Sequence, residues 1–146
     1  MVPTSSLKFE YQAFPASPND AFPDRHSVRR PVINIRFPLN GKSIFYPVLL
    51  DSGSDFCIFN AEIGDLLHIP VKSGKKMTFF GTSGTPQNAY FHTIHYELGG
   101  WDMECYAGFS YEMKTMPYGL LGQTGFFDKF RIEFNYAKKR IEIKPR

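Results

Sequence analysis

The sequence has few of the features that mark membrane, secreted or metal-binding proteins. No apolar run approaches the roughly 18 residues that a membrane-spanning helix needs. The N-terminus lacks the basic and apolar segments of a secretory signal, so we expect a cytoplasmic protein that does not associate with a membrane. The only two cysteines, Cys57 and Cys105, lie in apolar, strand-like segments and are predicted to be buried free thiols.

A large excess of charge of one sign is also missing. The 17 Lys and Arg residues only slightly outnumber the 14 Asp and Glu residues, and they form short clusters such as Lys138-Lys139-Arg140. Such clusters are typical of a solvated surface, so no nucleic-acid partner is expected. The chain has no evident internal repeat, and its 146 residues predict one globular domain.

Aromatic residues, in contrast, are abundant. The 15 Phe and 8 Tyr residues favour β structure, where aromatic side chains pack well on a pleated surface. Residues 1–30 are rich in proline and lack a sustained periodicity, so we expect an extended N-terminal arm with Phe9, Tyr11, Phe14 and Phe22 as anchors. Residues 31–146 are expected to form the all-β domain.

Alternation and turn signals give the order of the elements in this domain. Asn40-Gly41 is a strong two-residue hairpin signal between two apolar runs. A short strand is expected at 56–60, followed by a short helix over 61–69 with Ile63, Leu66, Leu67 and Ile69 near helical spacing. Two strands over 75–98 are expected around a Gly-rich turn, followed by a strand over 101–113. A candidate second short helix at 123–130 and a terminal hairpin over 130–144 complete the domain.

A carboxylate stands at the end of the apolar run that leads to Leu50. Asp51-Ser52-Gly53 follows this run directly, although an ionisable group beside a buried strand is costly unless it is paired, hydrogen-bonded or used. Alone, the tripeptide is more typical of an ordinary Asx turn that ends a strand. Its setting is more informative, because the apolar Leu120-Leu121-Gly122 follows about 70 residues later and a Gly-rich hairpin lies between the two.

This order of motifs resembles the retropepsin-like aspartic proteases, the single-domain relatives of retroviral proteases and pepsin, and points to a bacterial-type or cellular member. The resemblance spans residues 32–144 and implies a closed β-barrel or sandwich, the acid protease fold, with a flap hairpin and a terminal hairpin. The family motif apolar-apolar-Asp-Ser/Thr-Gly-Ala/Ser matches Leu49 to Ser54. Because the motif supplies one catalytic aspartate per chain, the resemblance implies a homodimer with two copies of Asp51 at the two-fold axis.

The resemblance also implies a role for each motif residue in an aspartic endopeptidase. The two Asp51 carboxylates would share a proton and activate a water molecule that attacks the peptide carbonyl. Ser52 would cross-link the two active-site loops, and the Gly53 carbonyl would accept a substrate amide. Ser54 stands where many retroviral enzymes have alanine, and a hydrogen bond from its hydroxyl to the dyad would favour the charged form. No metal or organic cofactor is implied.

The implied substrate is an extended polypeptide, bound by main-chain hydrogen bonds and with apolar side chains in subsites. Asp55 matches a position that binds substrate backbone, but Gln123 replaces its arginine partner of the retroviral enzymes. The hairpin Phe79–Tyr90 matches the flap. The expected substrate contacts are Ser54, Asp55, Phe80, Gly81, Thr82, Ser83, Gly84 and Leu120.

Other functions stay open at this point. A catalytically inactive retropepsin-like module could bind a peptide or protein, and an assembly domain could have dimerisation as its function. The strand Arg140–Lys144 and the Pro-rich arm are the expected interface contributors, and the arm is alternatively a pro-segment. His92 and His95 fall on opposite faces of a strand, which disfavours a shared metal site.

Overall fold

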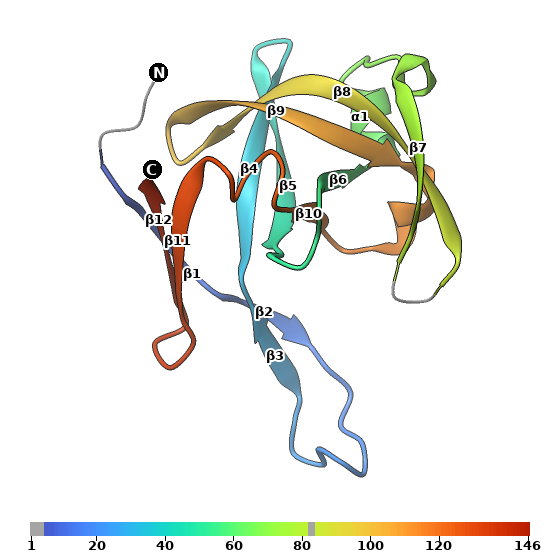
Figure 1. The fold of residues 1–146 in the computed structure, drawn as a ribbon. Helices are drawn as coiled ribbons and strands as arrows, with labels where there is room; N and C mark the ends of the chain where they lie inside the picture. The colour runs from blue at the N-terminus through green and yellow to red at the C-terminus, as the bar shows by residue number, and fades with distance from the viewer. Residues whose placement is uncertain (1–4, 82–83) are drawn as a thin grey trace.

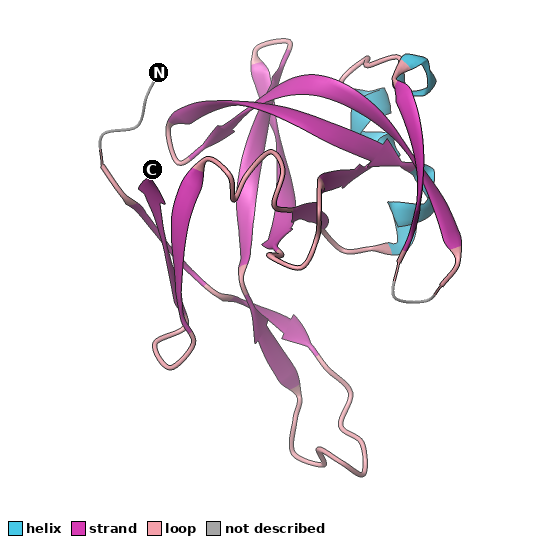
Figure 2. Ribbon diagram, in the orientation of Figure 1, coloured by secondary structure: helices cyan, strands magenta, loops and turns pink. Residues whose placement is uncertain are grey.

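The computed structural model describes residues 5–81 and 84–146, and most of it is β-strand (Figures 1 and 2). The strands are β1 (Leu7–Glu10), β2 (Gln12–Pro15), β3 (Ser27–Arg30), β4 (Val32–Leu39), β5 (Lys42–Leu50), β6 (Cys57–Asn60), β7 (Lys75–Phe80), β8 (Pro86–Leu98), β9 (Trp101–Ser110), β10 (Gly119–Leu121), β11 (Phe130–Asn135) and β12 (Arg140–Pro145). The helical segments are α1 (Ala61–Leu66) and the 3₁₀ helices η1 (Val71–Ser73) and η2 (Tyr111–Thr115). Among the described residues, no helix has the length and apolar character needed to cross a bilayer.

Six of the strands close into a barrel, which confirms the predicted all-β class. Seven strands are hydrogen-bonded in the order β4-β5-β10-β6-β9-β8-β7, and a pairing of Arg36 in β4 with Glu97 in β8 closes the sheet on itself. β10 runs parallel to β5 and β6 runs parallel to β9, whereas the other neighbours are antiparallel. Phe37, Phe59 and Phe109 fill the interior through edge-to-face ring contacts.

The turn between β4 and β5 has the conformation that its sequence predicts. Asn40 and Gly41 have φ angles of 49° and 76°, both in the left-handed region. A two-residue hairpin loop of this type needs positive φ at both positions, which Asn and Gly tolerate. The strands then pair in register from Leu39 opposite Lys42 onward. This register ends β5 immediately before Asp51 and so determines where the carboxylate leaves the sheet.

The predicted short helix is present but ends at Leu66, and the expected residues Ile63, Leu67 and Ile69 pack against the core as partly buried side chains. Asn60 caps α1, because its side chain accepts a 3.0 Å hydrogen bond from the N–H two residues later. The buried helix residues are Ala61 and Gly64, whereas Leu66 is 56% exposed. A Cβ on Gly64 would lie 2.7 Å from Cγ2 of Val71. The close approach of these segments therefore requires a small residue on the face that packs against the barrel.

Residues 123–130 do not form the second short helix that the sequence predicts. Thr124 forms an extended bridge with Phe56, and Gly125 follows with a φ angle of 109°, which a regular helix does not contain. Turns continue from there to β11, and Phe126 is fully buried in the core. The apolar residues of this segment are therefore explained by burial within a turn.

Residues 7–30 contain three strands where the sequence predicts an extended arm. β1 pairs with β12, and β12 pairs with β11 on its other edge, so the two ends of the chain form a three-stranded terminal sheet. Tyr11 follows β1 and is buried. β2 and β3 form a separate hairpin that projects from the barrel (Figure 1). The terminal hairpin is confirmed, whereas the domain boundary at residue 30 stays a prediction.

Candidate active site

The Asp51 carboxylate stands where β5 ends beside the parallel strand β10. The Asp51 N–H donates to the Leu121 carbonyl at 3.0 Å, and the chain then turns. In this turn the Ser54 N–H donates to the Asp51 carbonyl at 3.1 Å, and the Gly53 N–H donates to Asp51 Oδ1 at 3.0 Å. The second bond is that of an Asx turn, and it orients a carboxylate that remains partly exposed.

The segment after β10 stabilises this turn from its other side. The Gln123 N–H donates to the Ser54 carbonyl at 2.8 Å, and the N–H of the next residue donates to the Asp55 carbonyl at 2.9 Å. The Gln123 side chain adds a third bond, from Nε2 to the Ser52 carbonyl at 2.8 Å. The sequence indicated only that Gln123 replaces an arginine. In the structure it positions the backbone next to the carboxylate.

The other polar side chains of the turn point in different directions. The Ser54 hydroxyl donates to the Phe56 carbonyl at 2.8 Å, and within this one copy its proton is therefore directed away from the Asp51 carboxylate. Ser52 and Asp55 are exposed. Their roles toward a second chain and toward substrate therefore stay predictions.

A groove of about 550 Å³ connects Asp51 with the hairpin predicted to be the flap. The predicted site residues that line it are Asp51, Gly53, Ser54, Asp55, Phe80, Gly81 and Leu120. Thr82 and Ser83 lie outside the described residues, and the groove lining does not include Ser52 or Gly84. Much of the remaining lining is apolar, with Leu49, Phe56, Ile58, Phe79, Met113, Met116 and Tyr118. One cavity thus contains the carboxylate and several apolar surfaces that suit subsites.

The hairpin predicted to be the flap is formed by β7 and β8. The strands pair in register from Lys75 opposite Phe91 to Phe80 opposite Pro86. At the end of this ladder the Phe80 side chain is 68% exposed beside the groove. Gly84, with a φ angle of 75°, donates its N–H to the Gly81 carbonyl at 3.0 Å. Closure of this hairpin over a substrate stays a prediction.

Glu112 in η2 connects this hairpin to the barrel. Its carboxylate accepts hydrogen bonds from the Asn88 N–H in β8 at 3.3 Å and from the Ser110 hydroxyl at 3.0 Å. The β8–β9 ladder ends at Tyr90 opposite Phe109, so the Asn88 N–H has no partner in β9. The Glu112 carboxylate accepts this hydrogen bond instead. Burial raises the pKa of Glu112. The opposing effects are stronger together and hold the pKa below its ordinary value: a hydrogen bond from the Glu112 N–H, the two hydrogen bonds described above, and the positive charge of the nearby Lys76 ammonium.

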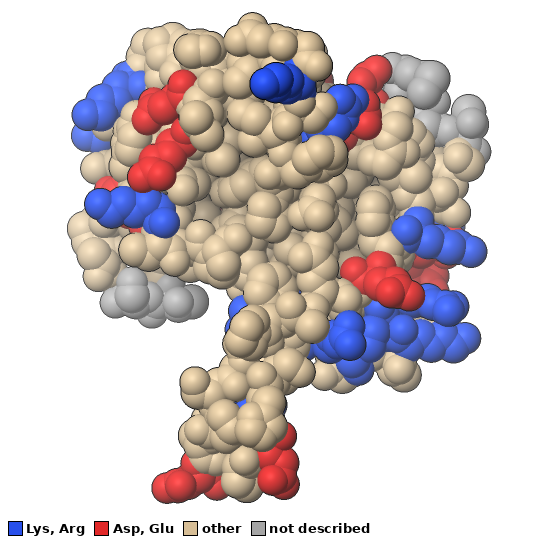
Figure 3. All heavy atoms as spheres, turned by 180° about the vertical axis from the view of Figure 1, so that it is seen from behind, with Lys and Arg blue, Asp and Glu red and all other residues tan. Residues whose placement is uncertain are grey.

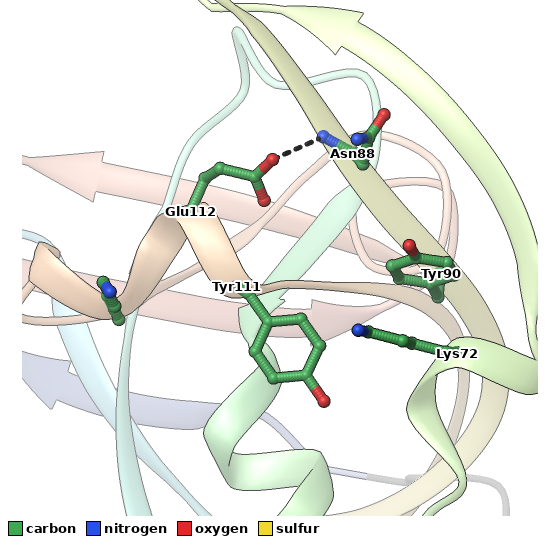
Figure 4. A pocket seen from close by; sticks show the side chains of 6 residues that line it. Lys72, Asn88, Tyr90, Tyr111 and Glu112 are labelled. Carbon is green, nitrogen blue, oxygen red and sulfur yellow. Dashed lines mark hydrogen bonds between the residues drawn. The ribbon is translucent and has the colours of Figure 1, made fainter.

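Glu112 also lines a second cavity, of about 370 Å³, that the sequence did not indicate. Its other lining residues are Lys72, Asn88, Tyr90, Tyr111 and Lys114 (Figure 4). The Tyr111 hydroxyl donates to Asp65 at 2.9 Å, and the Lys72 ammonium lies 5.6 Å from the centre of the Tyr111 ring. These residues come from η1, β8 and η2, which are far apart in the sequence, so only the fold brings them together.

Comparison with known proteins identifies the fold. No family model matches the sequence, and no curated protein matches it. Among solved structures, the chain is similar to the crystal structure of a retropepsin-like aspartic protease from Rickettsia conorii, with a TM-score of 0.60 and 14% sequence identity. The match covers 96% of this chain and 99% of that chain. The chain therefore has the retropepsin-like fold over almost its whole length.

Proposed function

We propose that the chain is an aspartic endopeptidase that is active as a homodimer, with Asp51 of each copy in one shared site. The observation that carries this proposal is the position of Asp51 in the groove that the β7–β8 hairpin and Leu120 also line. The retropepsin-like fold supports the same function. One copy contains one Asp-Ser-Gly sequence, so the second carboxylate comes from a symmetry-related copy.

The proposed chemistry uses the two carboxylates in different protonation states. Two ionised Asp51 side chains a few ångströms apart would repel each other, so the pair retains one proton. The ionised carboxylate takes a proton from water as the water oxygen bonds to the peptide carbonyl carbon, and the protonated carboxyl donates to the carbonyl oxygen. The tetrahedral intermediate then releases an amine and a carboxylic acid when the nitrogen is protonated and the C–N bond breaks.

The groove suits an extended polypeptide substrate with apolar side chains. Ile58, Met113 and Leu120 form apolar surfaces in the groove that contains the carboxylate, and burying an apolar side chain against such surfaces contributes about 1.5–3 kcal/mol. Phe80 lies on the β7–β8 hairpin, where it would cover a bound peptide and exclude water from the reacting bond. Main-chain hydrogen bonds to the exposed backbone of this hairpin would fix the direction of the peptide.

A catalytically inactive peptide-binding module is the second candidate, because Gln123 stands where the retroviral enzymes have arginine. The hydrogen bond from the Gln123 side chain to the Ser52 carbonyl weakens this alternative. The turn that holds Asp51 is ordered by a neutral side chain, so the loss of the arginine does not by itself remove the geometry that catalysis needs.

Incubation of the full chain with a mixed peptide library between about pH 4 and pH 7 tests the proposal, with products identified by mass spectrometry. We expect cleavage by the wild type and none by Asp51→Asn, while sedimentation shows the same dimer for both. Asp102→Asn is the matched control, because Asp102 is exposed on β9 and does not line the groove, and it should cleave normally. Binding without cleavage would support the inactive module, and cleavage retained by Asp51→Asn would exclude the proposed mechanism.

A further inference from the structure

The terminal sheet leaves its C-terminal strand no edge for a second copy of the chain. The order β1-β12-β11 places β12 in the centre, with β1 and β11 paired to its two edges. The pairs run from Leu7 opposite Ile143 on one side and from Phe130 opposite Pro145 on the other. Edge-to-edge pairing of Arg140–Pro145 with another copy would therefore require β1 or β11 to be displaced. The sequence-based expectation that this strand forms the interface is not favoured by the topology.

The hairpin β2–β3 has the opposite property, because each of its strands pairs on one side only. β2 and β3 form a two-stranded sheet, and no third strand from the described residues joins it. An N–H···O bond from Ala16 to the His26 carbonyl at 2.9 Å extends the ladder beyond the strands. An isolated two-stranded hairpin is at best marginally stable in water, and its unpaired edges are templates for another chain. We therefore expect that contacts with other parts of the protein or with another chain stabilise this hairpin.

The hairpin begins at the end of the barrel that carries Asp51. The Leu50 N–H donates to the Pro31 carbonyl at 3.0 Å, so the end of β3 is fixed beside the end of β5. The Phe14 ring contacts Tyr118 edge-to-face with a centroid distance of 5.7 Å, and Tyr118 lines the groove. From this base the hairpin projects past the end of β5, in the direction in which β7 also runs (Figures 1 and 2). A second copy that brought its Asp51 to this side would meet the hairpin.

The charges on this side of the molecule are self-complementary. The segment that connects β2 to β3 carries Asp20, Asp24 and one cation, Arg25, whose guanidinium lies 4.7 Å from the centre of the Phe22 ring. Figure 3 shows acidic side chains at the tip of the projection. Lys138 and Arg140 lie at the turn between β11 and β12 and are exposed. The described residues place no oppositely charged group within 4.0 Å of the two aspartates or of the two cations at this turn. Phe22, 55% exposed, adds an apolar contact at the tip.

We propose that the β2–β3 hairpin is the arm that binds a second copy of this chain, with its acidic tip against the basic β11–β12 turn of the partner copy. The proposal rests on the proposed function, which requires two copies with their Asp51 turns facing each other. In a two-fold dimer each copy donates its hairpin and receives the other, so the interface forms twice. Under this proposal the dimer interface is formed by the β2–β3 hairpin. It is not formed by β12, whose two edges are already paired.

The first test removes the projection and keeps its base. Replacing residues 16–26 of the full chain by Asn-Gly retains the β2–β3 ladder and the contact between Phe14 and Tyr118. Sedimentation velocity over a concentration series should show that the dimer dissociation constant rises at least tenfold, while circular dichroism shows an unchanged fold. An unchanged dissociation constant in the folded variant would overturn the proposal.

A second test uses charge and does not depend on the shortened loop. Asp20→Lys combined with Asp24→Lys should weaken the dimer, and adding Lys138→Glu with Arg140→Glu should restore it, because the charge pairs are then reversed. The control is Asp102→Lys, on β9 of the barrel, which should leave the dissociation constant unchanged. Weakening without restoration would overturn the contact between the tip and the β11–β12 turn.

The two proposals fail in different ways. A wild-type dimer that depends on the hairpin but cleaves no peptide would contradict the proposed function and support the hairpin arm. A dimer that cleaves peptides through Asp51 and is insensitive to both hairpin variants would contradict the arm and support the function. A chain that cleaves peptides as a monomer would overturn both.

Discussion

Replacing Gly122 by alanine tests whether the segment after β10 determines the geometry of the Asp51 turn. A Cβ at this position would lie 2.2 Å from the Phe56 carbonyl oxygen and 2.6 Å from the Ser54 carbonyl oxygen. Both oxygens belong to the backbone, so they cannot rotate away as the end of a flexible side chain can. The turn or the end of β10 must therefore shift to accommodate one methyl group.

The cost of this shift can be estimated from its parts. Overpacking of a tight contact typically costs about 1–3 kcal/mol. A shift that also breaks the hydrogen bond from the Gln123 N–H to the Ser54 carbonyl costs about 1 kcal/mol more. We expect Gly122→Ala to lower the free energy of unfolding by about 3 kcal/mol, which lowers the Tm by roughly 6–12 °C for a chain of this length. Cleavage should fall at least tenfold, because Asp51 is displaced with the turn.

Thermal unfolding followed by circular dichroism measures the effect, with Gly81→Ala as the matched control. The nearest atom to a Cβ on Gly81 lies 3.9 Å away, so this alanine fits and the Tm should change by no more than about 1–2 °C. If Gly122→Ala unfolds at the wild-type temperature and keeps full activity, the close contact at Gly122 does not hold the turn and the reasoning is refuted.

Three further substitutions test individual contacts. Gln123→Glu keeps the shape of the side chain but removes the donor to the Ser52 carbonyl, so kcat/KM in the peptide assay should fall about tenfold with little change in Tm; unchanged kcat/KM would contradict the positioning role. Tyr46→Phe leaves the Asn60 N–H without its acceptor and should cost about 1–2 kcal/mol in urea unfolding. Burial raises the pKa of Tyr46 to about 12 and also raises that of Tyr96, so spectrophotometric titration of the variant should show one late-ionising tyrosine fewer than the wild type. The pKa of Glu112 is lowered by folding, so its stabilising effect is present above its ordinary pKa and is lost as pH falls through the lowered value. Wild type should therefore have a higher Tm than Glu112→Gln at pH 7, and the difference should start to shrink below the ordinary glutamate pKa of about 4.3 and vanish once the pH is below the lowered pKa. A difference that does not vary with pH would contradict this.

Local signals in the sequence predicted most of the barrel. Asn40-Gly41 predicted its hairpin because a two-residue loop with two positive φ angles restricts the residue types strongly. Alternation predicted β9 and the terminal hairpin. One face of β9 and of β12 is largely buried, whereas Phe134 in β11 is 39% exposed. The resemblance implied that Asp51, the β7–β8 hairpin and Leu120 belong to one site, and all three line the same groove.

The features that sequence reasoning missed depend on contacts between distant segments. The predicted helix at 123–130 fails because Thr124 pairs with Phe56, a contact between residues far apart in the chain. The strands β1, β2 and β3 have only four residues each, too few for alternation to be recognised among prolines. Glu112 gave no local signal, because its role depends on the end of β9 and on a donor in β8.

The shared dyad is the central claim, and mixing wild type with Asp51→Asn tests it most directly. If each site needs one carboxylate from each of two copies, an inactive copy forms inactive mixed dimers with the wild type. A ninefold excess of Asp51→Asn over a fixed amount of wild type should then reduce peptide cleavage to about one tenth, since random pairing leaves only that fraction of wild-type chains in fully competent dimers. Cleavage that is unaffected by the excess, under conditions where the two proteins exchange subunits, would show that one Asp51 suffices and would contradict the account.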